Sequence, residues 1–167
     1  MRMLPQWRVK CGEWRTHTEQ STAARQLLGE ILGYEAIVEH DPQGAPYLRE
    51  NPNLHISISH CRTAVAAVVS AEGRVGIDIE SRRKISPSLS ERVCTPEEQA
   101  AIDHSDDPAM AFLQLWTRKE AVLKCRGTGI KGFESMVHAL ENNNIEVHDL
   151  PCNLPDTVAA LAVLKDE

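Results

Sequence analysis

The stretch Val75-Gly76-Ile77-Asp78-Ile79-Glu80 alternates two kinds of residue along its whole length. Residues two apart in a β-strand point the same way, so Ile77 and Ile79 share one face and Asp78 and Glu80 share the other, with Cα atoms roughly 6.5 to 7 Å apart. Mg²⁺ binds one or two carboxylates together with phosphate oxygens and water. The stretch predicts a strand with a core face and an acidic face that suits a metal ion; two solvated acids on an edge strand are the alternative.

Two apolar segments precede this strand. Residues 54–59 alternate leucine or isoleucine with histidine or serine, and residues 63–70 are rich in valine. Because only short turns separate the three segments, we expect an antiparallel meander. Further upstream, a strand is expected over residues 8–14, and an apolar stripe predicts a helix over residues 19–32 that ends at Gly33.

Helices are expected to follow the acidic strand. Thr95-Pro96-Glu97-Glu98 is a capping box that predicts a short helix to about residue 103. Asp107-Pro108 opens a longer helix, which should run to Arg126 and stop at Gly127. Residues 157–164 are expected to form a closing strand. Together these elements predict the α+β class with a mostly antiparallel sheet.

The long predicted helix carries a third carboxylate. Helical spacings of three and four relate Trp116, Lys119, Glu120, Leu123 and Lys124, which places them on adjoining parts of one surface. Glu120 and Lys124 form an i, i+4 pair in the favourable order, and an ordinary surface ion pair is the alternative reading. Because the apolar face of this helix must pack on the sheet, we expect Glu120 to approach Asp78.

Composition limits the possible functions. The chain has 167 residues and a formal net charge of -6, which argues against a general nucleic-acid binder. No apolar run approaches the ~18 residues of a membrane span. Five scattered cysteines fit a reduced, cytoplasmic protein. Locally basic segments at 82–84 and 118–131 are either solvated surface or a landing patch for an acidic partner.

The ordered set of motifs resembles the signature of 4′-phosphopantetheinyl transferases. It comprises Gly76-Ile77-Asp78-Ile79-Glu80, then Trp116-Thr117-Arg118-Lys119-Glu120-Ala121 and Lys124, with Ile58-Ser59-His60 and Gly44-Ala45-Pro46 upstream. The resemblance covers about residues 44–130 and is to the surfactin-type branch. It implies an α+β fold of two similar lobes related by a pseudo-twofold axis. We expect these lobes at residues 1–74 and 75–167, with coenzyme A and Mg²⁺ between them and the metal site on the second lobe.

The resemblance also implies an activity: transfer of the 4′-phosphopantetheine arm of coenzyme A to a serine of an apo acyl or peptidyl carrier protein, releasing adenosine 3′,5′-bisphosphate. Asp78, Glu80 and Glu120 then correspond to the Mg²⁺ ligands, and Glu120 is also the catalytic base. Lys119 is assigned either to substrate or to structure, and Glu98 matches a family acid. The coenzyme A contacts that we expect are Ser59, His60, Lys119, Lys124 and Arg25.

This chain also departs from the family pattern. Ala45 stands where relatives often carry lysine, so one phosphate contact is expected either to be lost or to be supplied elsewhere, by Arg49 or Arg62. The segment before His60 is short for this branch, so weaker affinity for coenzyme A is expected. The carrier should dock near residues 82–84 and 119–131, on a monomer. Two alternatives remain: a non-catalytic module that binds coenzyme A or a carrier, and another Mg²⁺-dependent phosphate enzyme such as a nucleotide hydrolase.

Overall fold

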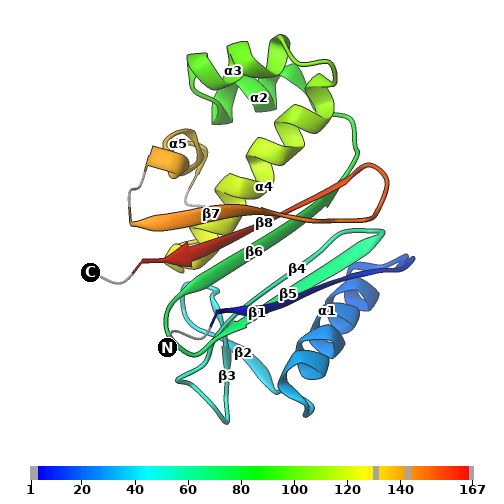
Figure 1. The fold of residues 1–167 in the computed structure, drawn as a ribbon, viewed down its shortest axis with the longest axis vertical. Coiled ribbons are helices and arrows are strands. Elements are labelled where there is room, and N and C mark those ends of the chain that lie inside the picture. The colour runs from blue at the N-terminus through cyan, green and yellow to red at the C-terminus, as the bar shows by residue number, and fades with distance from the viewer. Residues whose placement is uncertain (1–3, 130–131, 142–143, 166–167) are drawn as a thin grey trace.

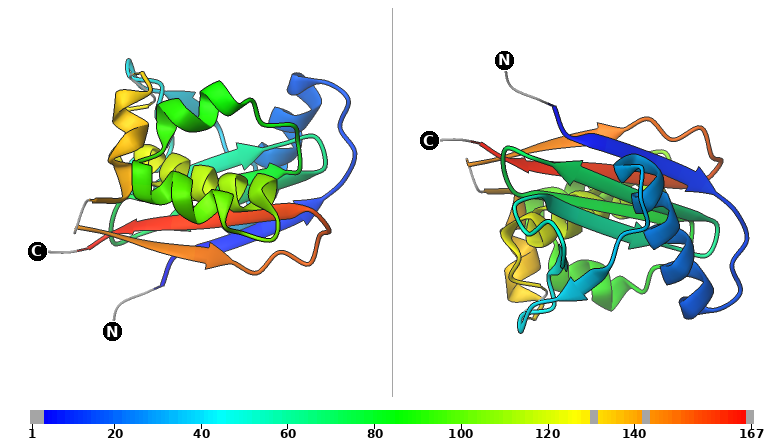
Figure 2. Two further views of the ribbon diagram at one scale, coloured as in Figure 1. Left: turned by 90° about the horizontal axis from the view of Figure 1, so that it is seen from above. Right: turned by 90° about the horizontal axis from the view of Figure 1, so that it is seen from below.

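The computed structural model describes residues 4–129, 132–141 and 144–165. Two three-stranded antiparallel sheets pack face to face, and a long helix covers the outer face of each (Figures 1 and 2). The apolar side chains between the sheets include Ala66 and Val68 from one and Ile77, Ile79 and Leu161 from the other. The predicted α+β class with mostly antiparallel sheet is confirmed.

The first sheet has the order β1-β5-β4, and helix α1 packs on it. These elements are β1 (Gln6–Cys11), α1 (His17–Leu32), β4 (His55–His60) and β5 (Ala64–Ser70). A separate hairpin is formed by β2 (Val38–His40) and β3 (Pro46–Leu48). The N-terminal end of α1 has a capping box, in which the Thr16 side chain accepts from Glu19 N–H and the Glu19 side chain accepts from Thr16 N–H.

The second sheet has the order β6-β8-β7, and helix α4 packs on it. These elements are β6 (Val75–Ser81), α4 (Pro108–Arg126), β7 (Ile145–Leu150) and β8 (Thr157–Leu164). Smaller helices α2 (Pro87–Val93), α3 (Pro96–Asp103) and α5 (Glu134–Val137) and the short 3₁₀ helix Ala139–Glu141 surround α4. In each sheet the central strand is the last of the three along the chain, β5 in one and β8 in the other, and the two earlier strands pair with its two edges. The two halves therefore share one strand order, while the predicted division at residues 74 and 75 stays a prediction.

The expected meander is wrong, because β6 does not continue the sheet of β4 and β5. It pairs with β8, more than 75 residues later, from Val75 opposite Val163 to Ser81 opposite Thr157. Two serines of β4 bind the other edge of β6. Ser57 Oγ accepts from Ile77 N–H (3.1 Å), and Ser59 Oγ accepts from Ile79 N–H (3.2 Å). The serine side chains thus satisfy backbone donors that a neighbouring strand would otherwise bind.

The long helix follows its prediction closely. Asp107 caps the start of α4 by accepting from Met110 N–H, and Gly127 ends it in a left-handed conformation with φ of 70°. The first strand ends at Cys11, earlier than predicted, and no sequence pattern predicted β2, β3, β7, α2 or α5. In the part of the chain that the structure describes, no helix is long and apolar enough to cross a membrane.

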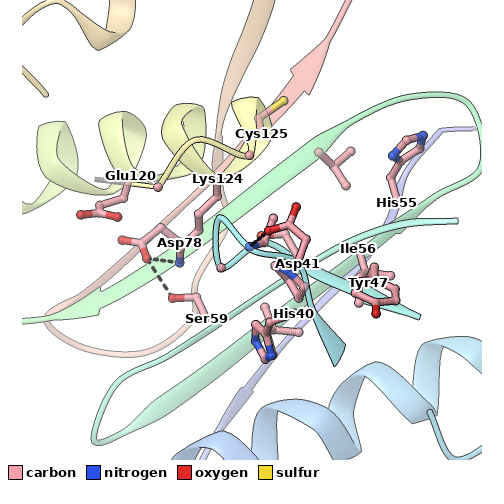
Figure 3. Close-up of a pocket in the computed structure, with 18 of the residues that line it drawn as sticks. His40, Asp41, Tyr47, His55, Ile56, Ser59, Asp78, Glu120, Lys124 and Cys125 are labelled. Carbon is pink, nitrogen blue, oxygen red and sulfur yellow. Dashed lines mark hydrogen bonds and ion pairs between the residues drawn. The ribbon is translucent and has the colours of Figure 1, made fainter. Parts of the chain in front are cut away.

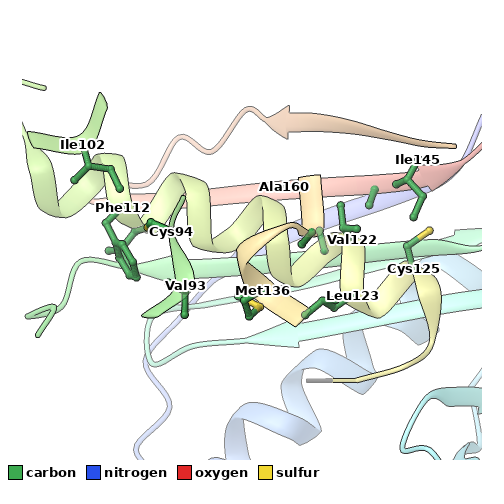
Figure 4. Close-up of a cluster of buried hydrophobic side chains, with 14 residues drawn as sticks. Val93, Cys94, Ile102, Phe112, Val122, Leu123, Cys125, Met136, Ile145 and Ala160 are labelled. Carbon is green, nitrogen blue, oxygen red and sulfur yellow. The ribbon is translucent and has the colours of Figure 1, made fainter. Parts of the chain in front are cut away.

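Gly76 decides how closely α4 approaches the sheet. A Cβ atom at this position would lie 1.9 Å from Ala121 O and 2.5 Å from Cys125 N, both backbone atoms of α4. The helix backbone therefore lies directly on β6, and apolar side chains of α4 such as Val122 fill the core beside this contact (Figure 4). As a result, Glu120 and Lys124 lie beside Asp78, two residues further along the same strand face.

Candidate active site

A cavity of about 780 Å³ lies between the two halves of the molecule. Strands β4 and β6, helices α1 and α4 and the β2–β3 hairpin all contribute to its walls. Among the predicted site residues, those that line it are Arg25, Ser59, His60, Asp78, Glu80, Glu120 and Lys124. The fold thus brings together the three predicted metal ligands and the expected coenzyme A contacts other than Lys119, and it leaves out the substitute arginines Arg49 and Arg62.

Asp78 lies at the centre of the hydrogen bonds in this cavity (Figure 3). Its side chain is buried, and its Oδ1 accepts from Ser59 Oγ (2.9 Å) and Lys124 Nζ (2.8 Å). Lys124 also donates to Ile77 O (3.1 Å). The predicted pair of Lys124 with Glu120 is therefore replaced by a pair with Asp78, because the sheet lies closer to the ammonium group than the preceding helical turn does.

The charge of Asp78 affects the pKa values of the other two carboxylates, Glu80 and Glu120. Burial first, and then the charge of Asp78, raises the pKa of Glu120 to about 7. The same two causes, in the same order, raise the pKa of Glu80. Glu80 also forms an ion pair with Arg83, at 3.6 Å between Glu80 Oε2 and Arg83 Nε. Three acids are thus close enough to repel one another, in a wall that is largely shielded from water.

This acidic wall suits a hard cation. Asp78 Oδ2 is buried and has no hydrogen-bond partner among the described residues, and a divalent cation would satisfy it and relieve the repulsion between the acids. Within residues 4–129, 132–141 and 144–165, however, no three His, Cys, Asp or Glu side chains are grouped tightly enough to form a ready metal site. The donor set fits Mg²⁺, while the predicted three-ligand arrangement stays a prediction.

His60 projects from the end of β4 toward α1. Its Nδ1 donates to Gln20 Oε1 (3.1 Å), an orientation fixed by the Gln20 amide group, which donates to Trp14 O (3.5 Å). The ring also meets His17 edge-on, at 4.7 Å between centroids. Burial, His17 and Lys124 lower the pKa of His60, and an anion in the cavity would raise it again. His17 and Gln20 were missed by the sequence analysis because no motif includes them.

Lys119 does not face the cavity. Its side chain is completely buried, and its ammonium group donates to Val93 O (2.7 Å), Glu98 Oε2 (2.6 Å) and Val137 O (2.9 Å). Glu98 Oε2 also accepts from Thr95 N–H, which caps α3. Of the two roles considered for Lys119, substrate or structure, this geometry supports structure: the lysine ties α4 to the residues at the ends of α2 and α5 and to α3.

The arginines proposed to replace a lysine at position 45 lie elsewhere. Arg49 pairs with Glu39 on the hairpin, and neither Arg49 nor Arg62 lines the cavity. Among the described residues, the lysine and arginine side chains that line it are Arg25, Lys124 and Arg74. Arg74 was missed because it follows the turn residue Gly73, outside every motif.

The fold and the cavity define a two-lobed α+β protein with an acidic and cationic site between its lobes. The chain matches the 4′-phosphopantetheinyl transferase superfamily over residues 74–158, and it belongs to that superfamily. The family resemblance seen in the motifs is confirmed.

Individual relatives agree with this assignment. The chain is 31% identical over 152 residues to the 4′-phosphopantetheinyl transferase psf-1 of Bacillus pumilus, a match that covers 78% of this chain and 64% of the relative. It is 27% identical over 169 residues to Sfp of Bacillus subtilis, covering 89% and 73%, and 34% identical over 113 residues to AcpT of Escherichia coli O157:H7, covering 65% and 58%. The match therefore spans less than two thirds of the length of psf-1 and AcpT.

Proposed function

We propose that this protein transfers the 4′-phosphopantetheine arm of coenzyme A to a serine of an apo acyl or peptidyl carrier protein and releases adenosine 3′,5′-bisphosphate. Family membership supports the reaction class. The single observation that carries the proposal is the meeting of Asp78, Glu120 and Lys124 with Ser59 and His60 in one cavity between the lobes.

The pyrophosphate of coenzyme A is assigned to the region between Lys124, Ser59 and His60. The Lys124 ammonium group has a third N–H for a phosphate oxygen, beyond those that it donates to Ile77 O and Asp78 Oδ1. The Ser59 hydroxyl donates to Asp78 Oδ1 in this structure and would donate to phosphate after turning away from that carboxylate. His60 adds a donor once the anion favours its imidazolium form. Asp78, Glu80 and Glu120 would hold Mg²⁺, in agreement with the buried Asp78 oxygen that lacks a partner. When bound, the metal ion neutralises the charge of the pyrophosphate and of the leaving group.

Glu120 is assigned as the general base. A carboxylate whose pKa is about 7 is matched to proton abstraction near neutral pH, although a cation beside it would lower this pKa. The serine oxygen of the carrier bonds to the phosphorus that carries the pantetheine arm, and its proton passes to Glu120. The bond from that phosphorus to the bridging oxygen breaks, and its electron pair leaves with adenosine 3′,5′-bisphosphate.

The carrier is proposed to dock beside this end of the cavity. Arg83 and Lys84 are exposed there, and the Arg83 guanidinium lies 5.9 Å from the centre of the Trp116 ring. Arg82 forms ion pairs with Asp107 and Asp156, so less of its charge is available to a partner. Residues 130 and 131 of the predicted docking segment lie outside the described residues.

The five cysteines are free thiols, in line with the cytoplasmic location that remains a prediction.

The test is direct transfer. The protein is incubated with coenzyme A, Mg²⁺ and several apo carriers, and each carrier is weighed by mass spectrometry. We expect the mass of one phosphopantetheine group to be added, only with Mg²⁺, and far more slowly with Glu120→Gln. Binding of coenzyme A without transfer to any carrier would instead identify a binding module, and phosphate release without a carrier would identify a hydrolase.

A further inference from the structure

The cavity has two chemically different ends. Asp78, Glu80 and Glu120 form the acidic end. Arg74 lies four residues before Asp78 along the chain, roughly 13 Å away if the strand is extended. Figure 3 shows His55 on the side of the cavity away from Glu120, and the charge of Arg74 reaches His55, whose pKa it lowers after burial. A ligand that fills the cavity therefore meets a cation far from the proposed metal ligands.

Arg74 is held in place by its backbone and its side chain. Its carbonyl oxygen accepts from Leu164 N–H (3.0 Å) and Cys125 Sγ (3.3 Å). Its Nη1 donates to Arg126 O (2.9 Å) near the C-terminal end of α4. No ion pair joins Arg74 to a carboxylate in the described ranges of the chain. The guanidinium is thus oriented without a counter-charge, which is the arrangement that an anionic ligand group requires.

Arg74 is exposed, and two small residues lie beside the rest of its guanidinium. A Cβ atom placed on Gly127 would lie 3.5 Å from Arg74 Nη2 and 3.9 Å from the Ala45 Cβ. Neither Ala45 nor Gly127 has a side chain long enough to cover the guanidinium. The Nη2 atom of Arg74 is therefore left open toward the cavity, where Ala45 and Gly127 also form part of the lining.

We propose that Arg74 binds the 3′-phosphate of coenzyme A and makes this protein select coenzyme A over 3′-dephospho-coenzyme A. The proposal rests on the proposed function. Coenzyme A carries two phosphate groups: a pyrophosphate, assigned above to the Lys124 end, and a phosphomonoester on the ribose. The monoester is left for the opposite end, where a guanidinium binds phosphate oxygens in a bidentate manner. In this chain Arg74, from the turn before β6, would supply the cation that Ala45 cannot.

The experiment measures dissociation constants by calorimetry for coenzyme A and for 3′-dephospho-coenzyme A. For the unaltered protein we expect at least about tenfold tighter binding of coenzyme A, since charge-assisted hydrogen bonds are the stronger class. Arg74→Gln should weaken coenzyme A binding about tenfold and leave binding of the dephosphorylated form unchanged. Arg8→Gln is the matched control, because Arg8 lies on β1 away from the cavity and pairs with Glu30.

A second variant tests the place as well as the charge. Adding Ala45→Lys to Arg74→Gln puts an ammonium group beside the place of the lost guanidinium, and restored selection of coenzyme A would support a phosphate site between residues 45 and 74. Equal effects of Arg74→Gln on both ligands, or none, would overturn the Arg74 proposal and leave the proposed function standing. If the unaltered protein binds neither ligand, the proposed function fails, and the Arg74 proposal fails with it.

Discussion

The two halves of the molecule share a strand order but differ in how the helix meets its sheet. Helix α1 packs on β5 through side chains such as Ala24 and Leu28, which fit against Val65. Helix α4 instead places its own backbone on β6, at Gly76. The comparison shows that the close approach of α4 to β6 is what places Glu120 and Lys124, two residues on the surface of the helix, in the same cavity as Asp78.

The same difference shapes what each helix contributes. Helix α1 reaches the cavity with His17, Ser21 and Arg25, which lie one turn apart from its first residue onward, whereas α4 reaches it with Glu120 and Lys124 near its C-terminal end. The first helix therefore offers side chains suited to an anion. The second supplies the carboxylate proposed as the base.

Removing the close approach should have the largest effect. Gly76→Ala would force its new Cβ against backbone atoms of α4, which cannot move aside as a side chain can. We expect the free energy of unfolding to fall by about 4 kcal/mol and transfer to be lost. Urea denaturation measures the first and carrier mass the second. Gly73→Ala is the control, because its Cβ would make only an ordinary 3.7 Å contact with Leu164 O; equal stability of the two variants would refute this account of Gly76.

The two lysines of α4 allow the next test. Lys119→Met leaves a partly buried carboxylate and two carbonyl oxygens without their shared donor, and should lower the free energy of unfolding by about 3 kcal/mol. Lys124→Met removes a half-buried cation at the cavity and should lower the free energy of unfolding by about 1 kcal/mol. It should nevertheless weaken coenzyme A binding far more than Lys119→Met does. Denaturation and calorimetry on both variants separate the roles, and a reversed order would contradict the assignment.

Local sequence patterns predicted the elements that depend on local chemistry. The capping residues Asp107 and Gly127 correctly predicted both ends of α4, and the alternation of Ile77 and Ile79 with Asp78 correctly separated core from cavity. Each of these features is decided by residues within a few positions of one another.

Features that depend on distant pairing could not be predicted. The partner of β6 is β8, and nothing in either strand specifies the other, so short turns wrongly suggested a meander. For the same reason the helical spacing predicted a Glu120 partner for Lys124, whereas the fold supplies Asp78 at 2.8 Å. Arg74 was missed because it lies in a turn, where sequence periodicity gives no direction for the side chain.

The raised pKa of Glu120 predicts a pH-dependent cost. The folded protein holds this proton up to about pH 7, whereas an unfolded glutamate releases it near 4.5, so stability falls as pH rises between these values. Glu120→Gln removes the effect and should raise the free energy of unfolding at pH 8 by about 2 kcal/mol in the presence of a chelator.

The control for that prediction compares the free energies of unfolding of the unaltered protein and Glu120→Gln at several pH values. The difference between the two proteins should shrink as pH falls and disappear well below pH 4.5, where the glutamate is protonated in both the folded and the unfolded state. Mg²⁺ at pH 8 should raise the melting temperature of the unaltered protein more than that of Glu120→Gln. A stability difference that does not change with pH would show that the carboxylate is not desolvated as described.

The smallest expected effect comes from the junction between the two sheets. Ser57→Ala removes the acceptor of the buried Ile77 N–H while leaving Ser59, which binds Asp78, in place. We expect a loss of about 1 kcal/mol in the free energy of unfolding, the lower end of the cost of an unsatisfied buried donor. Hydrogen exchange at Ile77 N–H should also become faster, while exchange at Ile79 N–H changes little. Ser88→Ala, at an exposed serine of α2, serves as the control; unchanged exchange at Ile77 would mean that the β4 serines do not join the two sheets.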